Sequence, residues 1–283
     1  MRENLPSRTA QFVAFNRALG HLSPVVPGFA DPVAEALVPP RFHRWVQNGK
    51  RAVARGKSPY PFWTRGMGYC HQFRTVVLDQ AVAAVAPVAQ LVVLGAGLDA
   101  RAWRLPELGD ATVFEVDHLA TQTWKREHVA ALPPRAREVR FVTMDFLHDD
   151  LAAKLTEAGL DRETPTFWLW EGVTMYLPSK SVAATLSAMA QLSRAGSGAA
   201  VTYMARKNGR MPTSPFLALM GEPVQSAFDP PEFAELARAA GWETAGDSGI
   251  RDWLSERTPS LRLRPRQVGL QWNERVWVGR RTA

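Results

Sequence analysis

The sequence has few of the residues that cross-link a chain or anchor it in a membrane. Its single cysteine, Cys70, excludes an internal disulfide and any cysteine-rich metal site. No apolar run approaches the roughly 18 residues of a membrane span, and the first residues, MRENLPSRTAQ, lack the apolar stretch of a signal peptide. We therefore expect a cytoplasmic protein with no membrane partner and with Cys70 as a small buried side chain.

Positive charge is in moderate excess and is spread along the sequence. The 34 Lys and Arg residues outnumber the 27 Asp and Glu residues, which gives a net charge of +7 and makes an anionic partner worth considering. The densest basic cluster, RTPSLRLRPRQ from Arg257, alternates with Leu261 and Leu263 as in a strand with one solvated face. No nucleic-acid-reading motif accompanies the charge, so nucleic-acid binding is not expected.

The order of apolar and polar segments predicts two parts. Residues 1–86 read as helices broken by proline-rich joints such as LSPVVPGFADPV, which predicts an N-terminal helical cap or lid. Over residues 87–283, strands alternate with helices, and an insertion interrupts the pattern at about 206–223. This alternation predicts an α/β fold with a doubly wound, mostly parallel sheet and an antiparallel C-terminal strand. The five predicted parallel strands are LVVL, TVFEVD, VRFVTMD, FWLWEG and GAAVTYMA.

A glycine-rich turn follows the first predicted strand. Gly95 and Gly97 let the backbone turn sharply and approach a ligand closely. In an open parallel sheet, ligands bind outside the carboxyl ends of the strands. About twenty residues further on, Asp117 closes the second strand, where a carboxylate can accept both hydroxyls of a ribose. The turn and this acid predict a nucleoside cofactor.

Two further strands end on carboxylates. Asp145 closes the third predicted strand and Glu171 the fourth. Three consecutive predicted strands that each end on an acid favour a cofactor with several hydrogen-bond donors. S-adenosylmethionine offers ribose hydroxyls, an adenine amino group and an aliphatic ammonium. Taken singly, Asp117 and Asp145 could instead cap the helices that follow them.

A nicotinamide dinucleotide is the rival cofactor. The residues from Gly95 to Ala100 satisfy G-x-G-x-x-G/A, and Asp117 lies near the spacing of an NAD(P)-dependent oxidoreductase. A pyrophosphate, however, favours a helix N-terminus without negative charge, and Asp99 stands in this turn. A non-catalytic protein that binds nucleosides or nucleic acid is a third class left open.

Several motifs, in order, resemble the leucine carboxyl methyltransferase family, including its bacterial branch of S-adenosylmethionine-dependent O-methyltransferases that act on polyketides and other small molecules. These motifs are SRTAQFVAFNRALG, FRTVVLD, GAGLDARAWRL, FEVD, VTMDF and WEGVTMYL. The resemblance implies a Rossmann-like class I methyltransferase fold, S-adenosyl-L-methionine as cofactor and a small-molecule or peptide substrate.

The resemblance also implies roles for individual residues. Asp117 matches the acid that holds the ribose hydroxyls, and Asp145 with Phe146 matches the pair that reads the adenine. Glu171 and Arg74 match the residues at the amino and carboxylate ends of the cofactor. The implied cofactor-binding set is Arg74, Gly95, Ala96, Gly97, Asp117, Asp145, Phe146 and Glu171.

The acceptor site has fewer signals. The resemblance places Arg17 near the reactive centre, and Tyr176 could point its hydroxyl at the substrate. An ionised carboxylate acceptor needs no general base, whereas a phenol or alcohol needs one, with His71, His118 and Tyr176 as candidates. The sequence offers arginines near this site and no Ser-His-Asp or metal constellation, so we expect carboxyl methylation, with no metal. Apolar residues of the insertion region predict an acceptor pocket that the cap closes, namely Met204, Met211, Phe216, Leu217 and Met220.

Overall fold

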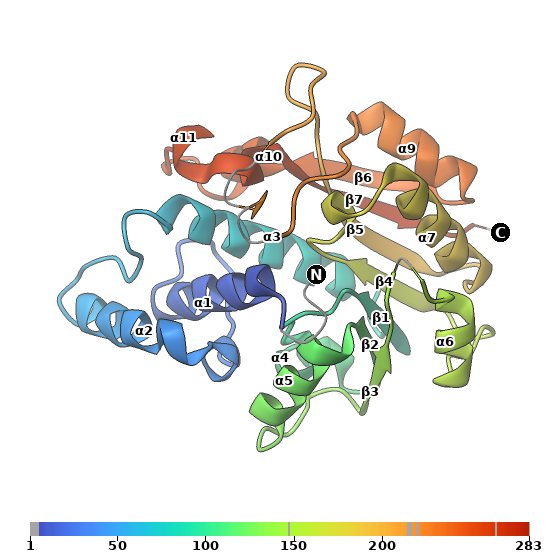
Figure 1. The fold of residues 1–283 in the computed structure, drawn as a ribbon, viewed down its shortest axis with the longest axis horizontal. Coiled ribbons are helices and arrows are strands. Elements are labelled where there is room, and N and C mark those ends of the chain that lie inside the picture. Colours follow the sequence, from blue (N-terminus) through green and yellow to red (C-terminus); the bar gives the residue numbers. More distant parts are fainter. Residues whose placement is uncertain (1–5, 147, 214–216, 219–220, 264, 283) are drawn as a thin grey trace.

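A seven-stranded sheet forms the centre of the computed structural model, which describes residues 6–146, 148–213, 217–218, 221–263 and 265–282 (Figure 1). The strands are β1 (Gln90–Leu94), β2 (Thr112–Asp117), β3 (Glu138–Thr143), β4 (Thr166–Trp170), β5 (Gly198–Met204), β6 (Glu243–Gly249) and β7 (Glu274–Arg280). Their order is β3-β2-β1-β4-β5-β7-β6, and β7 runs antiparallel to both of its neighbours. The predicted fold class is confirmed.

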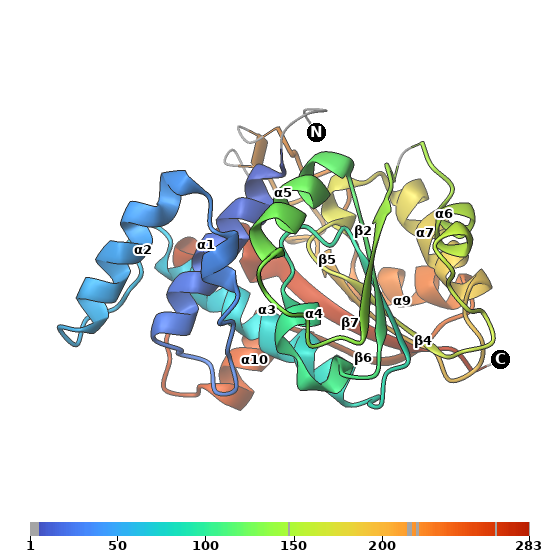
Figure 2. The same ribbon diagram turned by 90° about the horizontal axis from the view of Figure 1, so that it is seen from below.

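Helices cover both faces of this sheet (Figures 1 and 2). Among the described residues, the α-helices are α1 (Arg8–Leu22), α2 (Pro40–Val53), α3 (Arg65–Ala83), α4 (Arg101–Arg104), α5 (Leu119–Val129), α6 (Leu151–Glu157), α7 (Ser179–Gln191), α9 (Pro230–Ala239), α10 (Ile250–Arg257) and α11 (Pro265–Val268). Successive residues of β1 point to opposite faces. Leu91 and Val93 therefore pack in the core with α3, whereas Val92 and Leu94 pack in the core with α6 and α7.

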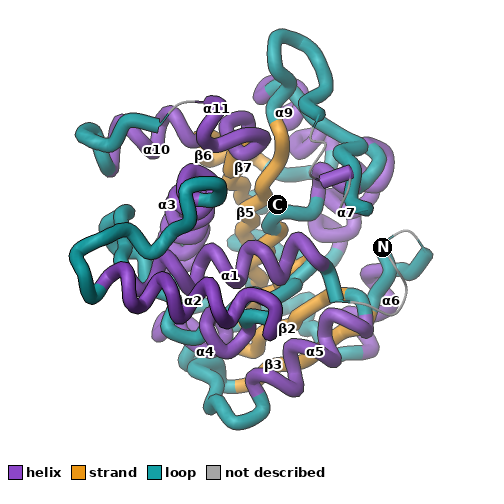
Figure 3. Tube along the Cα trace, turned by 60° about the vertical axis from the view of Figure 1, so that its left-hand side comes forward, coloured by secondary structure: helices purple, strands orange, loops and turns teal. Residues whose placement is uncertain are grey.

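The N-terminal helices have a small core of their own. Phe12, Phe15 and Leu19 of α1 pack with Val46 of α2 and with Tyr60. Helix α1 lies against both α2 and α3 (Figure 3). Helix α3 packs on the sheet, and α1 also places Ala14 in the central core, so α2 is the N-terminal helix whose buried residues pack in the small core alone. The division at residue 86 and the insertion at 206–223 stay predictions.

One strand prediction was wrong. Helix α10 ends at Arg257, and the described part of RTPSLRLRPRQ forms a loop and the short helix α11. Pro259 and Pro265 lack the N–H groups that a paired strand needs. Cys70 is buried with a free thiol, as expected. Among the described residues, no helix has the length and apolarity to cross a membrane.

Candidate active site

A cavity of about 450 Å³ opens at the carboxyl ends of β1, β2 and β4. Its wall is completed by α1, by α3 and by the segment that precedes α9. The cavity brings together the residues that the sequence predicts for cofactor binding and catalysis: Arg17, Arg74, Gly95, Ala96, Gly97, Asp117, Asp145, Phe146, Glu171 and Tyr176.

The turn after β1 requires glycine. Gly95 and Gly97 have φ angles of 64° and 51°, in the left-handed region. A Cβ atom on Gly95 would lie 2.3 Å from Cγ2 of Val173, and one on Gly97 would lie 3.2 Å from Cβ of Ala10. The two glycines therefore give the turn its shape and let Val173 and Ala10 pack directly against its backbone.

Asp117 holds the turn against the end of β2. One carboxylate oxygen accepts the N–H of Gly97 at 2.6 Å, and the other accepts the N–H of His118 at 2.6 Å. Burial raises the pKa of Asp117, while these two N–H groups oppose the rise. The alternative in which Asp117 only caps α5 is wrong, because the N-cap residue is His118.

Asp145 and Phe146 lie just beyond β3. Asp145 Oδ2 lies 3.0 Å from Nδ1 of His148, and the carboxylate of Asp145 is partly exposed. The N-cap residue of α6 is Asp150, so the capping alternative for Asp145 is also wrong. The ring of Phe146 stacks on Trp170, with centroids 6.4 Å apart and an interplanar angle of 17°. This stacking fixes the orientation of the Phe146 ring at the cavity wall.

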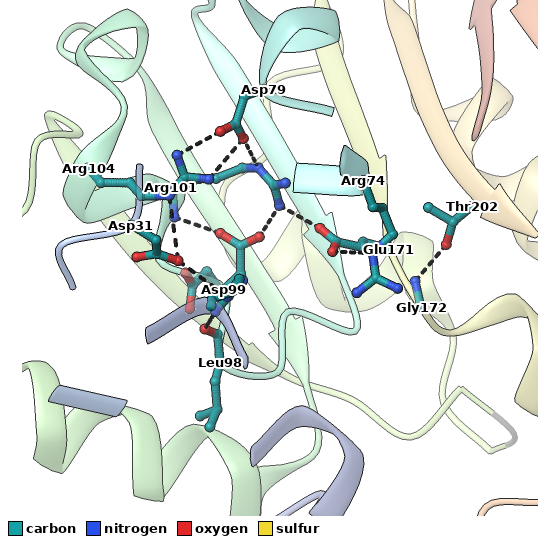
Figure 4. A network of polar contacts seen from close by, with 12 residues as sticks. Asp31, Arg74, Asp79, Leu98, Asp99, Arg101, Arg104, Glu171, Gly172 and Thr202 are labelled. Atoms are coloured by element: carbon teal, nitrogen blue, oxygen red, sulfur yellow. Dashed lines mark hydrogen bonds and ion pairs between the residues drawn. The ribbon is translucent and has the colours of Figure 1, made fainter. Parts of the chain in front are cut away.

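Arg74 from α3 is clamped between two carboxylates. Its Nε donates to Glu171 Oε1 at 2.7 Å, and its Nη1 donates to Glu274 Oε1 at 2.7 Å (Figure 4 shows Arg74 and Glu171). Glu274 is the first residue of β7, is 2% exposed and lines the cavity. Sequence reasoning missed Glu274, because only the fold brings it 2.7 Å from Arg74.

Arg101 from α4 is the centre of a buried ionic network (Figure 4). The side chain is fully buried, and it donates to Asp79 Oδ1 and to Glu171 Oε2 at 2.7 Å each. It also forms a close ion pair with Asp99. Burial alone would raise the pKa of Glu171, but Arg74 and Arg101 hold it well below its usual range. Glu171 therefore stays ionised at neutral pH.

Sequence reasoning also missed Arg101, and it misjudged Asp99. The only sequence signal for Arg101 was an arginine placed among the apolar residues of LDARAW. Asp99 is bound by the Arg101 side chain and by the Arg101 N–H at 2.6 Å. Its charge is therefore neutralised locally, so Asp99 is not a valid argument against a phosphate-bearing ligand.

The side chain of Arg17 contacts other parts of the protein. Its Nε lies 3.2 Å from Oδ2 of the buried Asp31, and its Nη2 donates to the carbonyl of Leu98. These contacts tie α1 to the loop that follows the glycine turn. The catalytic role of Arg17 stays a prediction.

The candidate bases line the cavity, but burial makes two of them, His71 and Tyr176, poorly suited to accept a proton. Burial, reinforced by Arg74, lowers the pKa of His71 well below its usual range. The Nδ1 of His71 is buried and has no hydrogen-bond partner among the described residues. Burial and the nearby Glu222 raise the pKa of Tyr176. His118 accepts the N–H of Ala120 through Nδ1 at 3.4 Å as it caps α5.

The insertion meets the start of α1 over the cavity. Glu222 accepts hydrogen bonds from the hydroxyl of Ser7 at 3.2 Å and from that of Thr9. Met204 and Leu217 line the cavity as predicted, whereas Met211 is exposed and is not part of the wall. The predicted pocket residues Phe216 and Met220 lie outside the described residues.

Comparisons with known proteins agree on one family. Residues 10–190 match the family model described as leucine carboxyl methyltransferase. A protein of Mycobacterium sp. (strain KMS), provisionally named an S-adenosyl-L-methionine-dependent methyltransferase, is 37% identical over 202 residues. That alignment covers 68% of this chain and 65% of the relative, so it spans slightly less than two thirds of the relative. A Mycobacteroides abscessus protein with the same provisional name is 30% identical, over 83% of this chain and 82% of its own.

Solved structures support the fold. A DUF574 family protein from Streptomyces avermitilis superposes with a TM-score of 0.59 at 14% identity, and the match covers 94% of this chain and 96% of that one. The CcbJ methyltransferase from Streptomyces caelestis superposes with a TM-score of 0.51 at 20% identity, over 73% of this chain and 88% of that one.

Proposed function

Because this chain belongs to the leucine carboxyl methyltransferase family, we propose that it is an S-adenosyl-L-methionine-dependent methyltransferase that methylates an acceptor oxygen. The cavity carries this proposal, because the glycine turn after β1 and the acids at the ends of β2, β3 and β4 meet there. The family gives no support to the nicotinamide oxidoreductase alternative.

The residues present fit S-adenosylmethionine. The left-handed turn at Gly95 and Gly97 lines the cavity, and carboxylates suit a ligand rich in donors and positive charge. The buried Nδ1 of His71 has no partner among the described residues, and a bound ligand would supply one. When bound, the cofactor supplies an electrophilic methyl group on a positively charged sulfur.

Each cavity residue has a proposed task. Asp117, already oriented by two N–H groups, would accept the ribose hydroxyls through its remaining lone pairs. Asp145 would accept the adenine amino group, while the fixed ring of Phe146 packs on the base. Glu171 and Arg74 would hold the amino and carboxylate ends of the methionine moiety.

A carboxylate is the acceptor that the site supports best. It is already a nucleophile at neutral pH, so its methylation needs no proton transfer. The environments of His71 and Tyr176 make both poor bases, since the first stays neutral and the second stays protonated. Tyr176 would then donate a hydrogen bond to the acceptor. Catalysis would consist of alignment and exclusion of water, which can contribute on the order of 7–11 kcal/mol.

Ligand binding tests the cofactor. S-adenosylhomocysteine at about 100 times its Kd is expected to raise the melting temperature by roughly 5–10 °C, because binding stabilises the folded state alone. NADH and NADPH at the same concentration are the matched controls and are expected to leave it unchanged. A shift with a dinucleotide and none with S-adenosylhomocysteine would reverse the assignment.

The product and the pH profile test the acceptor. Paired compounds that differ only in a carboxyl or a phenol group are offered with the methyl donor, and the product is treated with mild base. A base-labile methyl ester is expected, with a rate nearly constant from pH 6 to 9, because the acceptor is ionised throughout and neither His71 nor Tyr176 titrates in this range. A base-stable ether, formed at a rate that rises about tenfold per pH unit, would contradict carboxyl methylation.

A further inference from the structure

One long segment of the chain contains no acidic residue. Between Glu35 and Asp79 the sequence has no aspartate or glutamate, and it carries eight lysines and arginines. Arg74 belongs to the cavity, and Lys50 pairs with Glu35 at 2.5 Å. The other six cations form no ion pair among the described residues, and they are Arg41, Arg44, Arg51, Arg55, Lys57 and Arg65.

Helix α2 displays three of these cations on one side. Arg41, Arg44 and Arg51 are all exposed, and at 3.6 residues per turn they fall on one face of the helix. Val46 and Gly49 are buried on the opposite face, towards α1. Figures 1 and 2 place α2 at the outer edge of the molecule, away from the sheet. The arginine stripe therefore faces solvent along the whole helix.

Exposed aromatic rings lie on α2 and on the segment that contacts it at Trp63. Phe62 is 89% exposed, and Trp45 and Trp63 are 41% and 42% exposed. The two tryptophan rings meet edge to face, with centroids 5.9 Å apart. Scattered exposed apolar residues need no explanation, but large aromatic rings gathered beside unpaired cations mark an interaction surface. We name Arg41, Arg44, Trp45, Arg51, Phe62 and Trp63 the basic–aromatic face.

We propose that the basic–aromatic face attaches the protein to the surface of a membrane that contains anionic phospholipids. Basic residues together with tryptophan and phenylalanine are typical of helices that lie in a membrane interface. The apolar residues of α2 face α1, so its arginines would contact the head groups and the neighbouring aromatic rings the apolar layer. Arginines attract the anionic head groups, and tryptophan is favoured at the boundary between head groups and acyl chains. Phe62, almost fully exposed, would enter the apolar layer.

The expectation of no membrane partner was based on the lack of an apolar run long enough to span a membrane. Binding to a membrane surface needs no such run. The face also connects to the cavity, because Phe12 stacks on Trp63 with centroids 6.1 Å apart and lines the cavity as well. An apolar acceptor dissolved in the membrane would thus meet the protein on the side where α1 lies.

Vesicle sedimentation tests the proposal without any methyl donor, so its outcome is independent of the proposed function. The full chain is mixed with vesicles of phosphatidylcholine alone or with 40% phosphatidylglycerol. We expect at least tenfold stronger partitioning onto the anionic vesicles at low salt, and a steep loss of binding as salt screens the arginines. Equal partitioning onto both vesicles would overturn the proposal.

Charge-matched variants locate the surface. The double substitution Arg44→Glu/Arg51→Glu is expected to weaken binding at least tenfold. Arg135→Glu/Arg162→Glu makes the same charge change at exposed positions elsewhere and is expected to have little effect. Phe62→Ser should weaken binding several-fold without changing its salt dependence. Equal losses in the two double variants, or tighter binding to single-stranded oligonucleotides than to vesicles, would overturn the proposal.

Discussion

Replacement of Arg101 by methionine is expected to lower the free energy of unfolding by about 3–5 kcal/mol at pH 7 and to abolish measurable cofactor binding. The guanidinium is fully buried and contacts Asp79, Asp99 and Glu171. Methionine fills similar space but leaves Asp99 without its cation and Glu171 with only one of two. Urea unfolding and calorimetry with S-adenosylhomocysteine measure the two effects.

The pH dependence gives this prediction a second signature. In the wild type, arginines hold the pKa of Glu171 and Asp99 below their ordinary values, so the stabilisation is present at neutral pH and is lost as the pH falls through these lowered values. In the Arg101→Met variant, Asp99 loses its ion-pair partner and burial raises its pKa, while Glu171 keeps only Arg74. The stability deficit should therefore be largest at pH 7 and narrow as the pH falls towards about 4, where carboxylates protonate.

Arg104→Met is the matched control. Arg104 is 4% exposed in its side chain and donates to Asp79 at 2.7 and 2.9 Å, but it makes no contact with Glu171 among the described residues. Its loss should destabilise the fold and yet leave cofactor affinity within a few-fold of wild type. Equal loss of binding in the two variants would show that Arg101 acts only through general stability.

A second large effect is expected at Gly95. Gly95→Ala should lower the free energy of unfolding by about 2–4 kcal/mol, from the positive φ together with overpacking. The new methyl group would lie 2.3 Å from Val173, so the turn must shift. Because the turn lines the cavity, S-adenosylhomocysteine should bind at least tenfold more weakly, as calorimetry would show.

A second substitution, at Val173, separates the contribution of the positive φ from that of overpacking to the loss of stability. The double variant Gly95→Ala/Val173→Ala removes the side-chain atom that the new methyl group would meet, but it keeps the unfavourable φ of 64°. It should recover the overpacking part of the loss, with Val173→Ala alone as the reference. A double variant no better than Gly95→Ala would contradict steric conflict as the cause.

The predictable part of the site follows from regular structure. Gly95, Asp117 and Glu171 were found because each comes at or directly after the end of an apolar parallel strand, and such ends meet at one edge of a sheet. Asp145 was found in the same way, although β3 ends two residues before it, at Thr143. Local patterns and one topological rule suffice for these positions.

The rest of the site depends on packing between distant segments. Glu274 reaches Arg74 only after β7 has paired with β5, and Arg101 gathers acids from α3 and from the end of β4. No periodic pattern in the sequence predicts contacts between such distant segments. The exposed position of Met211 and the loop around Pro259 were misjudged for a related reason, since short apolar patterns do not show which surface a loop will cover.

The clamp on Arg74 also sets an order of events during synthesis. Its two acids lie 97 and 200 residues further along the chain, and the second stands at the start of the strand that lies between β5 and β6. A nascent chain that has emerged only as far as β6 therefore holds Arg74 without Glu274, and β6 has no neighbour with which to join the sheet. Until residue 274 leaves the ribosome, the protein has its glycine turn but lacks a finished pocket.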